Sequence, residues 1–294
     1  MYILGTSDSF SSPQLPRVHK RPYKYSIVQE SRHMAVESTC RHSNQTWQDL
    51  SEQQRQVLAQ RIIVNDDHHL LYCAVPLVGM GPWMKVLYFL GVGQGLPDIS
   101  KVPTKELGAR KNFVYLSSFS PEEQERRIRS YLSFMVTRHP FLRIAIAYKL
   151  KFEASNTFFH ERFGKEIVRK YRSGTKGNPT GDDVQFSEFV QYLVGTRSSA
   201  EMNEHWQPLE TLCRPCEVGY DFVLHHETLQ GDARELLIQA QLSNHIPSFP
   251  VDSWDYISMQ YVQRVFRGLS PALIGKLVEQ YSNDFALFSY SSLF

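Results

Sequence analysis

Two short segments place residues suited to anion binding directly after an apolar run. The first run, residues 70–75, leads into the turn Pro76-Leu77-Val78-Gly79-Met80-Gly81-Pro82 and then into a helical pattern. The second, residues 131–137, leads into Arg138-His139-Pro140 and a second helical pattern. A glycine-containing turn before a helix presents backbone N–H groups to an anion, and a guanidinium forms forked hydrogen bonds with phosphate. Together the two segments indicate a protein that handles phosphate.

The elements around these turns predict an α/β fold. Strands are expected over residues 70–75, 131–137 and 220–226, each followed by a helix. Ser120 and Ser270, each followed by a proline, are typical helix N-caps. A helix is also expected over residues 47–63. This order favours a mostly parallel, doubly wound sheet that binds its ligand at the carboxyl ends of the strands.

Length and composition favour one large domain. The 294 residues are 42% hydrophobic and 13% aromatic, enough for a substantial core. Residues 1–57 are expected to be an N-terminal leader and stem-like region, partly disordered, because the first 35 are rich in Ser, Pro and basic residues such as Arg17-Val18-His19-Lys20-Arg21. The compact domain is expected over residues 58–294. A net charge of +2 is too mild to indicate nucleic acid as a partner.

The four cysteines leave three kinds of site open. Cys213 and Cys216 form a C-x-x-C pair, whereas Cys40 and Cys73 stand alone. The pair is compatible with a redox site, half a zinc site or structural disulfides. No second ligand pair completes four zinc ligands, so no metal is expected, and no strand-to-helix context supports a thioredoxin-like site. Structural cysteines in an oxidising lumen are the favoured interpretation.

The start of the chain predicts no targeting segment. Residues 1–14 have neither a basic n-region nor a long apolar stretch, so neither a signal peptide nor a membrane anchor is expected, which predicts a cytosolic or truncated chain. The apolar stretch of residues 70–92 is interrupted by histidines, prolines and a lysine, and therefore favours a buried strand and helix. Asn44-Gln45-Thr46 is a glycosylation sequon that matters only in the secretory lumen.

A set of short motifs runs in order along residues 37–294. They are Cys40-Arg41-His42-Ser43, Tyr72-Cys73-Ala74-Val75-Pro76, Arg138-His139-Pro140-Phe141-Leu142-Arg143, Ala147-Tyr148-Lys149-Leu150-Lys151-Phe152, Gly181-Asp182-Asp183-Val184-Gln185-Phe186, Asn203-Glu204-His205-Trp206, Leu212-Cys213-Arg214-Pro215-Cys216, Tyr220-Asp221-Phe222-Val223, His226-Glu227-Thr228-Leu229 and Asp284-Phe285. This ordered set resembles the Golgi carbohydrate sulfotransferases that sulfate chondroitin, dermatan and terminal N-acetylgalactosamine or glucuronate units.

The resemblance implies a fold, a reaction and a location. The fold is a single sulfotransferase domain, with a P-loop-like, mostly parallel sheet flanked by helices. The reaction is sulfuryl transfer from 3'-phosphoadenylyl sulfate (PAPS), without a metal, to a hydroxyl of an N-acetylgalactosamine-containing glycan such as chondroitin or dermatan. The location is the lumenal side of the Golgi membrane. In such enzymes residues 76–85 hold the 5'-phosphosulfate and the Arg138 segment holds the 3'-phosphate. The implied donor ligands are Val78, Gly79, Gly81, Trp83, Lys85 and Arg138.

Several positions depart from the family pattern. Leu77 stands where the family has a lysine, Gly81 and Pro82 replace a hydroxyl-bearing residue and an asparagine, and Ile146 replaces a serine. Loss of one transition-state donor costs about 10²- to 10³-fold in rate, although Lys85 could reach back in part compensation. The alternative function is therefore a catalytically impaired member that binds a glycan or a partner protein. A nucleotide kinase is disfavoured because the chain lacks GxxxxGK[ST].

Two residues are candidates for the base that deprotonates the sugar hydroxyl. His205 fits because a neutral imidazole accepts a proton near neutral pH, but a packed structural histidine fits equally well. Glu227, at the end of an expected strand, is a base or a carboxylate at a helix N-terminus. Basic residues expected to attract a sulfated or uronate-containing glycan, with a solvated helix face as the alternative, are Lys149, Lys151, Arg162, Lys165 and Arg169.

Overall fold

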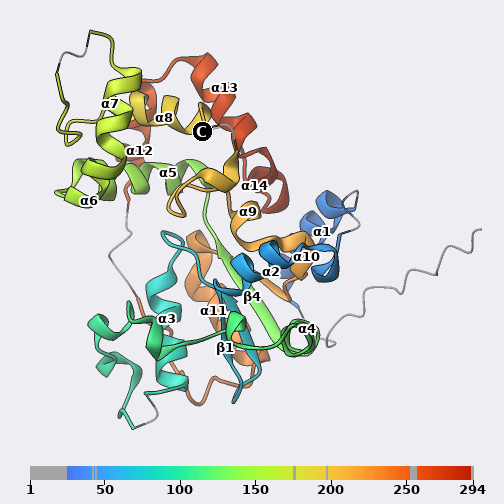
Figure 1. The fold of residues 1–294 in the computed structure, drawn as a ribbon. Coiled ribbons are helices and arrows are strands. Elements are labelled where there is room, and N and C mark those ends of the chain that lie inside the picture. The colour runs from blue at the N-terminus through green and yellow to red at the C-terminus, as the bar shows by residue number, and fades with distance from the viewer. Residues whose placement is uncertain are drawn as a thin grey trace, which may run out of the picture.

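The computed structural model describes residues 25–41, 43, 45–93, 95–174, 177–196, 198–251 and 257–292. The basic run at residues 17–21, His42 and the sequon residue Asn44 lie outside these ranges. A five-stranded sheet of order β3-β1-β2-β4-β5 forms the centre of one lobe of the molecule, the lower one in Figure 1. Its strands are β1 (Ile62–Asn65), β2 (Leu70–Cys73), β3 (Val114–Tyr115), β4 (Leu132–Thr137) and β5 (Phe222–His225).

The expected α/β fold is confirmed, with two additional strands, β1 and β3. Strands β2, β4 and β5 are parallel neighbours, whereas β1 pairs antiparallel with both β2 and β3. Strand β1 lies where the sequence predicts the end of a helix over residues 47–63. The helix instead ends at Ala59, because Ile62, Ile63 and Val64 are β-branched and complete a buried hairpin with β2.

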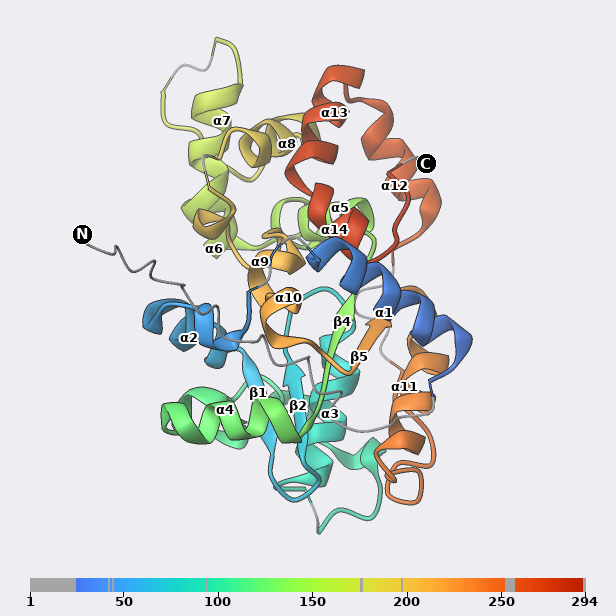
Figure 2. The same ribbon diagram turned by 90° about the vertical axis from the view of Figure 1, so that its right-hand side faces the viewer.

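Helices surround the sheet and form a second lobe beyond it (Figures 1 and 2). Those expected after the three parallel strands are present as α3, α5 and α11, and Ser120 and Ser270 cap α4 and α13 as predicted. The α-helices are α1 (Ile27–Cys40), α2 (Glu52–Ala59), α3 (Met80–Leu90), α4 (Pro121–Ser130), α5 (Pro140–Tyr148), α6 (Thr157–Phe159), α7 (Lys165–Tyr171), α8 (Phe186–Val194), α9 (Leu209–Cys213), α10 (Pro215–Val218), α11 (Leu229–Gln239), α12 (Met259–Arg267), α13 (Pro271–Gln280) and α14 (Ser282–Leu287). None of the helices in the described ranges is long and apolar enough to cross a membrane.

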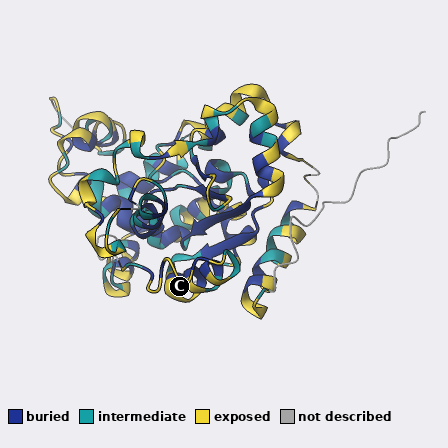
Figure 3. Ribbon diagram, turned by 90° about the horizontal axis from the view of Figure 1, so that it is seen from below, coloured by how far each residue is buried: buried dark blue, intermediate teal, exposed yellow. Residues whose placement is uncertain are grey.

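The molecule has two hydrophobic cores. The first surrounds the sheet, whose strands are largely buried (Figure 3), and includes Tyr72, Trp83 and Phe134. The second fills the helical lobe around Phe189 and Trp206. Helix α5 joins the two, since it follows β4 directly and its apolar side chains belong to the second core. The connection after β4 therefore lies at the junction of the two lobes.

Part of the segment 1–57, which the sequence analysis expects to be a leader, packs against the sheet in the described ranges that begin at Tyr25. Helix α1 contacts β5. Its Arg32 Nη1 lies 2.6 Å from Asp232 Oδ2 of α11 and donates to the Val223 carbonyl at 3.1 Å. Trp47 is buried in the first core. The apolar residues of α1 do not form a clear helical stripe in the sequence. The contacts of α1 with the sheet therefore hold this helix in position.

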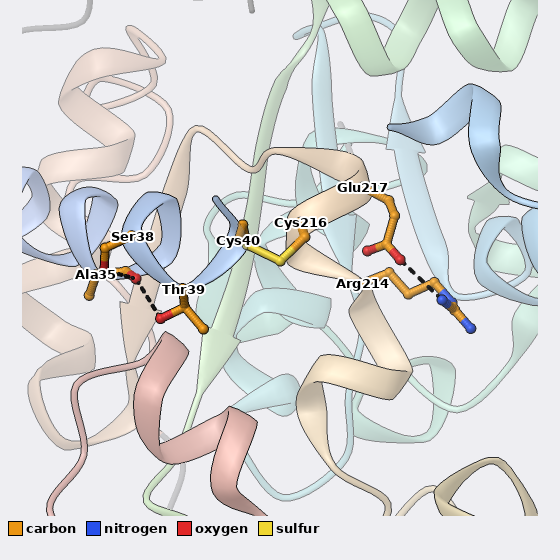
Figure 4. Close-up of a disulfide and its surroundings, with 7 residues drawn as sticks. All are labelled: Ala35, Ser38, Thr39, Cys40, Arg214, Cys216 and Glu217. Carbon is orange, nitrogen blue, oxygen red and sulfur yellow. Dashed lines mark hydrogen bonds and ion pairs between the residues drawn. A yellow bond between two sulfur atoms is a disulfide. The ribbon is translucent and has the colours of Figure 1, made fainter. Parts of the chain in front are cut away.

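Two disulfides pair each cysteine of the C-x-x-C segment with a distant partner. Cys40 at the end of α1 bonds to Cys216 of α10, as Figure 4 shows, and Cys73 at the end of β2 bonds to Cys213 of α9. All four cysteines are therefore structural, as the sequence favoured. The second disulfide fixes the point at which β2 enters the turn at residues 74–79.

Candidate functional site

The turn between β2 and α3 contains two residues with positive φ, Leu77 and Gly79, and only the glycine suits this conformation. Gly79 caps α3 with φ +91°, which favours glycine, and a Cβ at this position would lie 2.5 Å from Leu229 Cδ2, so a side chain here would strain the backbone and displace Leu229. Leu77 adopts φ +69°, a conformation that is costly for a branched side chain. The strained turn brings the start of α3 against the start of α11.

Arg138 joins the second predicted turn to the first. It follows β4, is only 2% exposed, and donates from Nη1 to the Leu77 carbonyl oxygen at 3.1 Å. The two turns meet because β2 and β4 are parallel neighbours, with Cys73 opposite Met135. The two motifs that the sequence singled out therefore form one site at the carboxyl ends of the strands, as expected for an open α/β sheet.

A cavity of about 470 Å³ lies beside this turn. It is lined by Gly79, Pro82, His226, Glu227, Thr228, Leu229, Gln230, Gly231, Pro250 and Val251. The described lining includes the carboxylate of Glu227 but no lysine or arginine side chain. An anionic ligand in this cavity would therefore depend mainly on backbone N–H groups.

The other expected donor ligands lie in different surroundings. Gly79 is at the cavity wall, and Gly81 is partly exposed in the first turn of α3. The side chains of Val78 and Trp83 are fully buried, with Trp83 packed against Phe134 and Phe249, so any contact with a ligand at these positions would come from the backbone. Lys85 is partly exposed on α3, one turn beyond Gly81, and is not among the residues lining the cavity.

Glu227 is held by partners on both carboxylate oxygens. Its Oε1 accepts from the backbone N–H of His139 at 2.9 Å, at the start of α5, and its Oε2 accepts from the Tyr290 hydroxyl at 2.9 Å. The Tyr290 hydroxyl also lies 3.1 Å from Thr137 Oγ1 at the end of β4. A carboxylate at a helix N-terminus is stabilised by the helix dipole. Glu227 therefore fastens the ends of β4 and β5 and the C-terminal segment together.

His205 lies in the turn that precedes α9. Its Nδ1 is 2.7 Å from Asn203 Oδ1, and its ring meets Phe159 edge-on. Burial, followed by the nearby charges of Lys151, Arg143 and Arg61, lowers the pKa of His205 to about 3. The ring is therefore neutral at physiological pH and only weakly basic. A general base works best when its pKa lies near the operating pH, and the pKa of His205 is well below that.

Arg143 holds the turn that contains His205 against the turn at residues 74–79, between β2 and α3. Its guanidinium is 2% exposed and donates to three backbone carbonyls, those of Pro76 at 3.3 Å, Glu204 at 2.5 Å and Gln207 at 2.5 Å. Burial lowers the pKa of Arg143 to about 10. Arg143 is therefore a structural cation that brings the turn at residues 204–207 beside Pro76.

The five basic residues expected to bind a glycan fall into two groups. Lys149 and Lys151, at the end of α5, place their ammonium groups over the rings of Tyr261 and Phe159, at 5.2 Å and 4.6 Å from the ring centres. The others lie on or near α7, where Arg162 and Arg169 are exposed and Lys165 pairs with Glu161. The structure thus separates a partly buried group near His205 from a solvent-exposed group on α7.

Sequence reasoning missed two residues of the site. Tyr290 binds Glu227, and His225 at the end of β5 stacks on the Tyr290 ring with centroids 4.6 Å apart. Burial, then the charge of Arg32, lowers the pKa of His225 to about 3. His225 lies in the predicted strand segment 220–226, at the strand end where ligands bind, and this position is the signal that could have identified it. Tyr290 carries no local signal, because its partners are distant in sequence.

Comparison with known proteins identifies the family. Residues 60–291 match the sulfotransferase family. The chain is 36% identical over 271 residues to carbohydrate sulfotransferase 14 of Danio rerio, covering 90% of this chain and 72% of that protein. It is 32% identical over 274 residues to carbohydrate sulfotransferase 11 of Rattus norvegicus, covering 90% and 76%. It is 31% identical over 283 residues to carbohydrate sulfotransferase 10 of Danio rerio, covering 92% and 76%. No solved structure matches significantly. The resemblance noted from the motifs is confirmed, and the chain belongs to the carbohydrate sulfotransferase family.

Proposed function

We propose that this protein transfers a sulfuryl group from PAPS to a hydroxyl of an N-acetylgalactosamine-containing glycan such as chondroitin or dermatan. Family membership supports sulfuryl transfer to a carbohydrate. One structural observation supports the proposed position of the PAPS-binding site. The turn at residues 74–79, Arg138 and a cavity of about 470 Å³ converge at the carboxyl ends of parallel strands.

The chain's own residues would act mainly by positioning. Backbone N–H groups at the start of α3, an 11-residue helix capped by Gly79, are placed to receive the 5'-phosphosulfate. Arg138, at the end of β4, would bind the 3'-phosphate, because a guanidinium forms forked hydrogen bonds with phosphate. Alignment of the acceptor oxygen, sulfur and leaving oxygen, with charge stabilisation on the leaving phosphate, supplies most of the rate in such transfers.

The disulfides support a lumenal location. Disulfides persist in oxidising compartments and are rare in the cytosol, and this chain has two that join segments 140 and 176 residues apart. We therefore place the protein in the Golgi lumen, on the lumenal side of the membrane.

A second function, glycan or partner binding without transfer, is favoured by the side chains of the donor site. Leu77 provides no cation at the turn, and the described lining of the adjacent cavity contains Glu227 but no lysine or arginine. A carboxylate facing the two phosphates of PAPS opposes binding, by charge repulsion. This function requires glycan affinity but no donor affinity.

Calorimetric titration with 3'-phosphoadenosine 5'-phosphate separates the two functions. The protein should be expressed with its disulfides intact and its fold checked by circular dichroism. Micromolar binding that is lost in Arg138→Ala but retained in Arg169→Ala, a charge removal on the distant α7, supports the transferase function. Absence of binding by folded wild-type protein rejects it and leaves the binding function.

A further inference from the structure

Three cations surround the turn at residues 203–205, and two carboxylates act on them. Arg61 Nη1 lies 2.9 Å from Glu204 Oε2. Arg143 donates to the Glu204 carbonyl, and the charges of Asp284 and Glu204 both act on Arg143, whereas Glu204 also acts on Lys151. All three cations lower the pKa of His205. Because Arg61 and Lys151 share the single carboxylate of Glu204, this part of the cluster carries an excess of positive charge that attracts an anion.

The hydrogen bonds of Asn203 determine the tautomer of His205. Asn203 Oδ1 accepts from the backbone N–H of His205 at 3.1 Å and lies 2.7 Å from its Nδ1. An amide oxygen can only accept, so Nδ1 must carry the proton in this arrangement. In the neutral ring Nε2 then has a free lone pair and is a hydrogen-bond acceptor. Asn203 thus holds the imidazole with Nε2 able to accept a hydrogen bond from a hydroxyl.

Lys151 is held where its charge is poorly hydrated. Its ammonium lies 4.6 Å from the centre of the Phe159 ring, and the same ring meets His205 edge-on with centroids 5.3 Å apart. Burial lowers the pKa of Lys151. A partly desolvated ammonium regains favourable interactions when an anion binds. Arg143 links this cluster to the donor turn through the Pro76 carbonyl.

The exposed basic surface on α7 is a weaker anion site. Lys165 pairs with Glu161, and Arg172 pairs with both Asp183 and Glu188. Those charges are already neutralised by carboxylates. The remaining Arg162, Arg169 and Lys170 are solvent-exposed, where a single charge pair contributes little.

We propose that Arg61 and Lys151 bind one anionic group of the glycan acceptor, a uronate carboxylate or a sulfate ester, while His205 Nε2 accepts a hydrogen bond from a sugar hydroxyl. Asn203 is the positioning residue of this subsite, because it fixes the tautomer of His205. The choice of a glycan as the ligand rests on the proposed function. The anion preference rests on the charges of the cluster.

The subsite couples anion binding to protonation of His205. The groups that act on the ring are Lys151, Arg143 and Arg61, all cationic, with Glu204 beside them. A bound carboxylate or sulfate offsets these cations. The pKa of His205 should then rise from about 3 toward its ordinary value.

The test is calorimetry without any donor nucleotide, so that it is independent of the donor site. Three hexasaccharides serve as probes: unsulfated chondroitin, its carboxyl-reduced form, and a carboxyl-reduced 4-sulfated form. We expect binding of the first and third but not of the neutral second. If only the unsulfated hexasaccharide binds, the preferred anion is the carboxylate. If only the carboxyl-reduced, 4-sulfated hexasaccharide binds, the preferred anion is the sulfate ester. Lys151→Gln and Arg61→Gln should each weaken binding about tenfold, whereas the matched Arg169→Gln should not.

Imidazole NMR of His205 provides a readout other than affinity. The free protein should show Nδ1-protonated His205, and Asn203→Ala should mix the tautomers without unfolding the protein. Addition of the unsulfated hexasaccharide should raise the pKa of the ring. Binding that is weakened by Arg169→Gln but not by Lys151→Gln or Arg61→Gln would overturn the proposal and assign the glycan to α7. Equal binding of the neutral hexasaccharide would overturn it as well.

Discussion

Arg138 at the end of β4 donates a hydrogen bond of 3.1 Å to the backbone carbonyl of Leu77, in the turn that follows β2. This contact holds the two anion-binding turns together across neighbouring parallel strands. It also fixes the backbone of Leu77, which has φ +69° and stands where the family has a lysine. The turn therefore lacks a cation only because its side chain at position 77 is leucine, since Arg138 already holds the backbone of this turn.

Leu77→Lys should raise sulfuryl transfer from PAPS to unsulfated chondroitin. A cation at this position stabilises charge on the leaving oxygen, and one such donor changes the rate by about 10²- to 10³-fold. Leu77→Met is the uncharged control and should leave the rate at the wild-type level. The measurement is radiolabelled sulfate incorporation under single-turnover conditions. A folded Leu77→Lys protein that binds the nucleotide but shows no gain would contradict the prediction and assign the deficit to Gly81, Pro82 and Ile146.

The two disulfides should differ in their effect on donor binding. Replacement of either cysteine pair by serine should lower the free energy of unfolding by about 2–5 kcal/mol, measured by urea denaturation. Only the Cys73–Cys213 pair should also weaken nucleotide binding, because Cys73 directly precedes the donor turn. The Cys40–Cys216 pair is the matched control, since it fastens α1. Equal loss of nucleotide affinity in both variants would show that the effect is global.

His225 should make the protein less stable in acid. Its pKa is lowered to about 3 in the folded state, by burial first, whereas the unfolded chain binds a proton below about 6.5. Stability is therefore lost as the pH falls from about 6.5 toward 3, and at pH 5 the loss is about 2 kcal/mol. His225→Phe keeps the stacking on Tyr290 and should remove this part of the pH dependence. Urea denaturation at pH 5 and pH 7 measures it, and parallel curves for both proteins would refute it.

Glu227→Gln should reveal a structural carboxylate. Both oxygens of Glu227 accept hydrogen bonds, from the His139 N–H and the Tyr290 hydroxyl. We expect Glu227→Gln to lower the free energy of unfolding by about 1 kcal/mol and Tyr290→Phe to have a similar effect, with the pH profile of transfer unchanged in both. Loss of the acidic limb of that profile in a fully stable Glu227→Gln protein would instead identify Glu227 as the base.

The sequence by itself determined the local elements and the two turns. The apolar runs of β2, β4 and β5 and the Ser-Pro starts of α4 and α13 are decided by neighbours within a few residues. Arg138 is a candidate donor ligand for the same reason, because it directly follows a buried strand. Parallel pairing then follows from the alternation of strands and helices.

Only the tertiary structure decided which distant residues meet. Four cysteines allow three pairings, and the choice depends on where α1, α9 and α10 pack. Trp83 lies in the motif but its side chain is directed into the first core, because the helix period and the sheet beneath it set the buried face. The cluster of Arg61, Lys151 and His205 draws on three segments that have no sequence relation. Such contacts depend on packing and charge between remote segments, which local pattern does not encode.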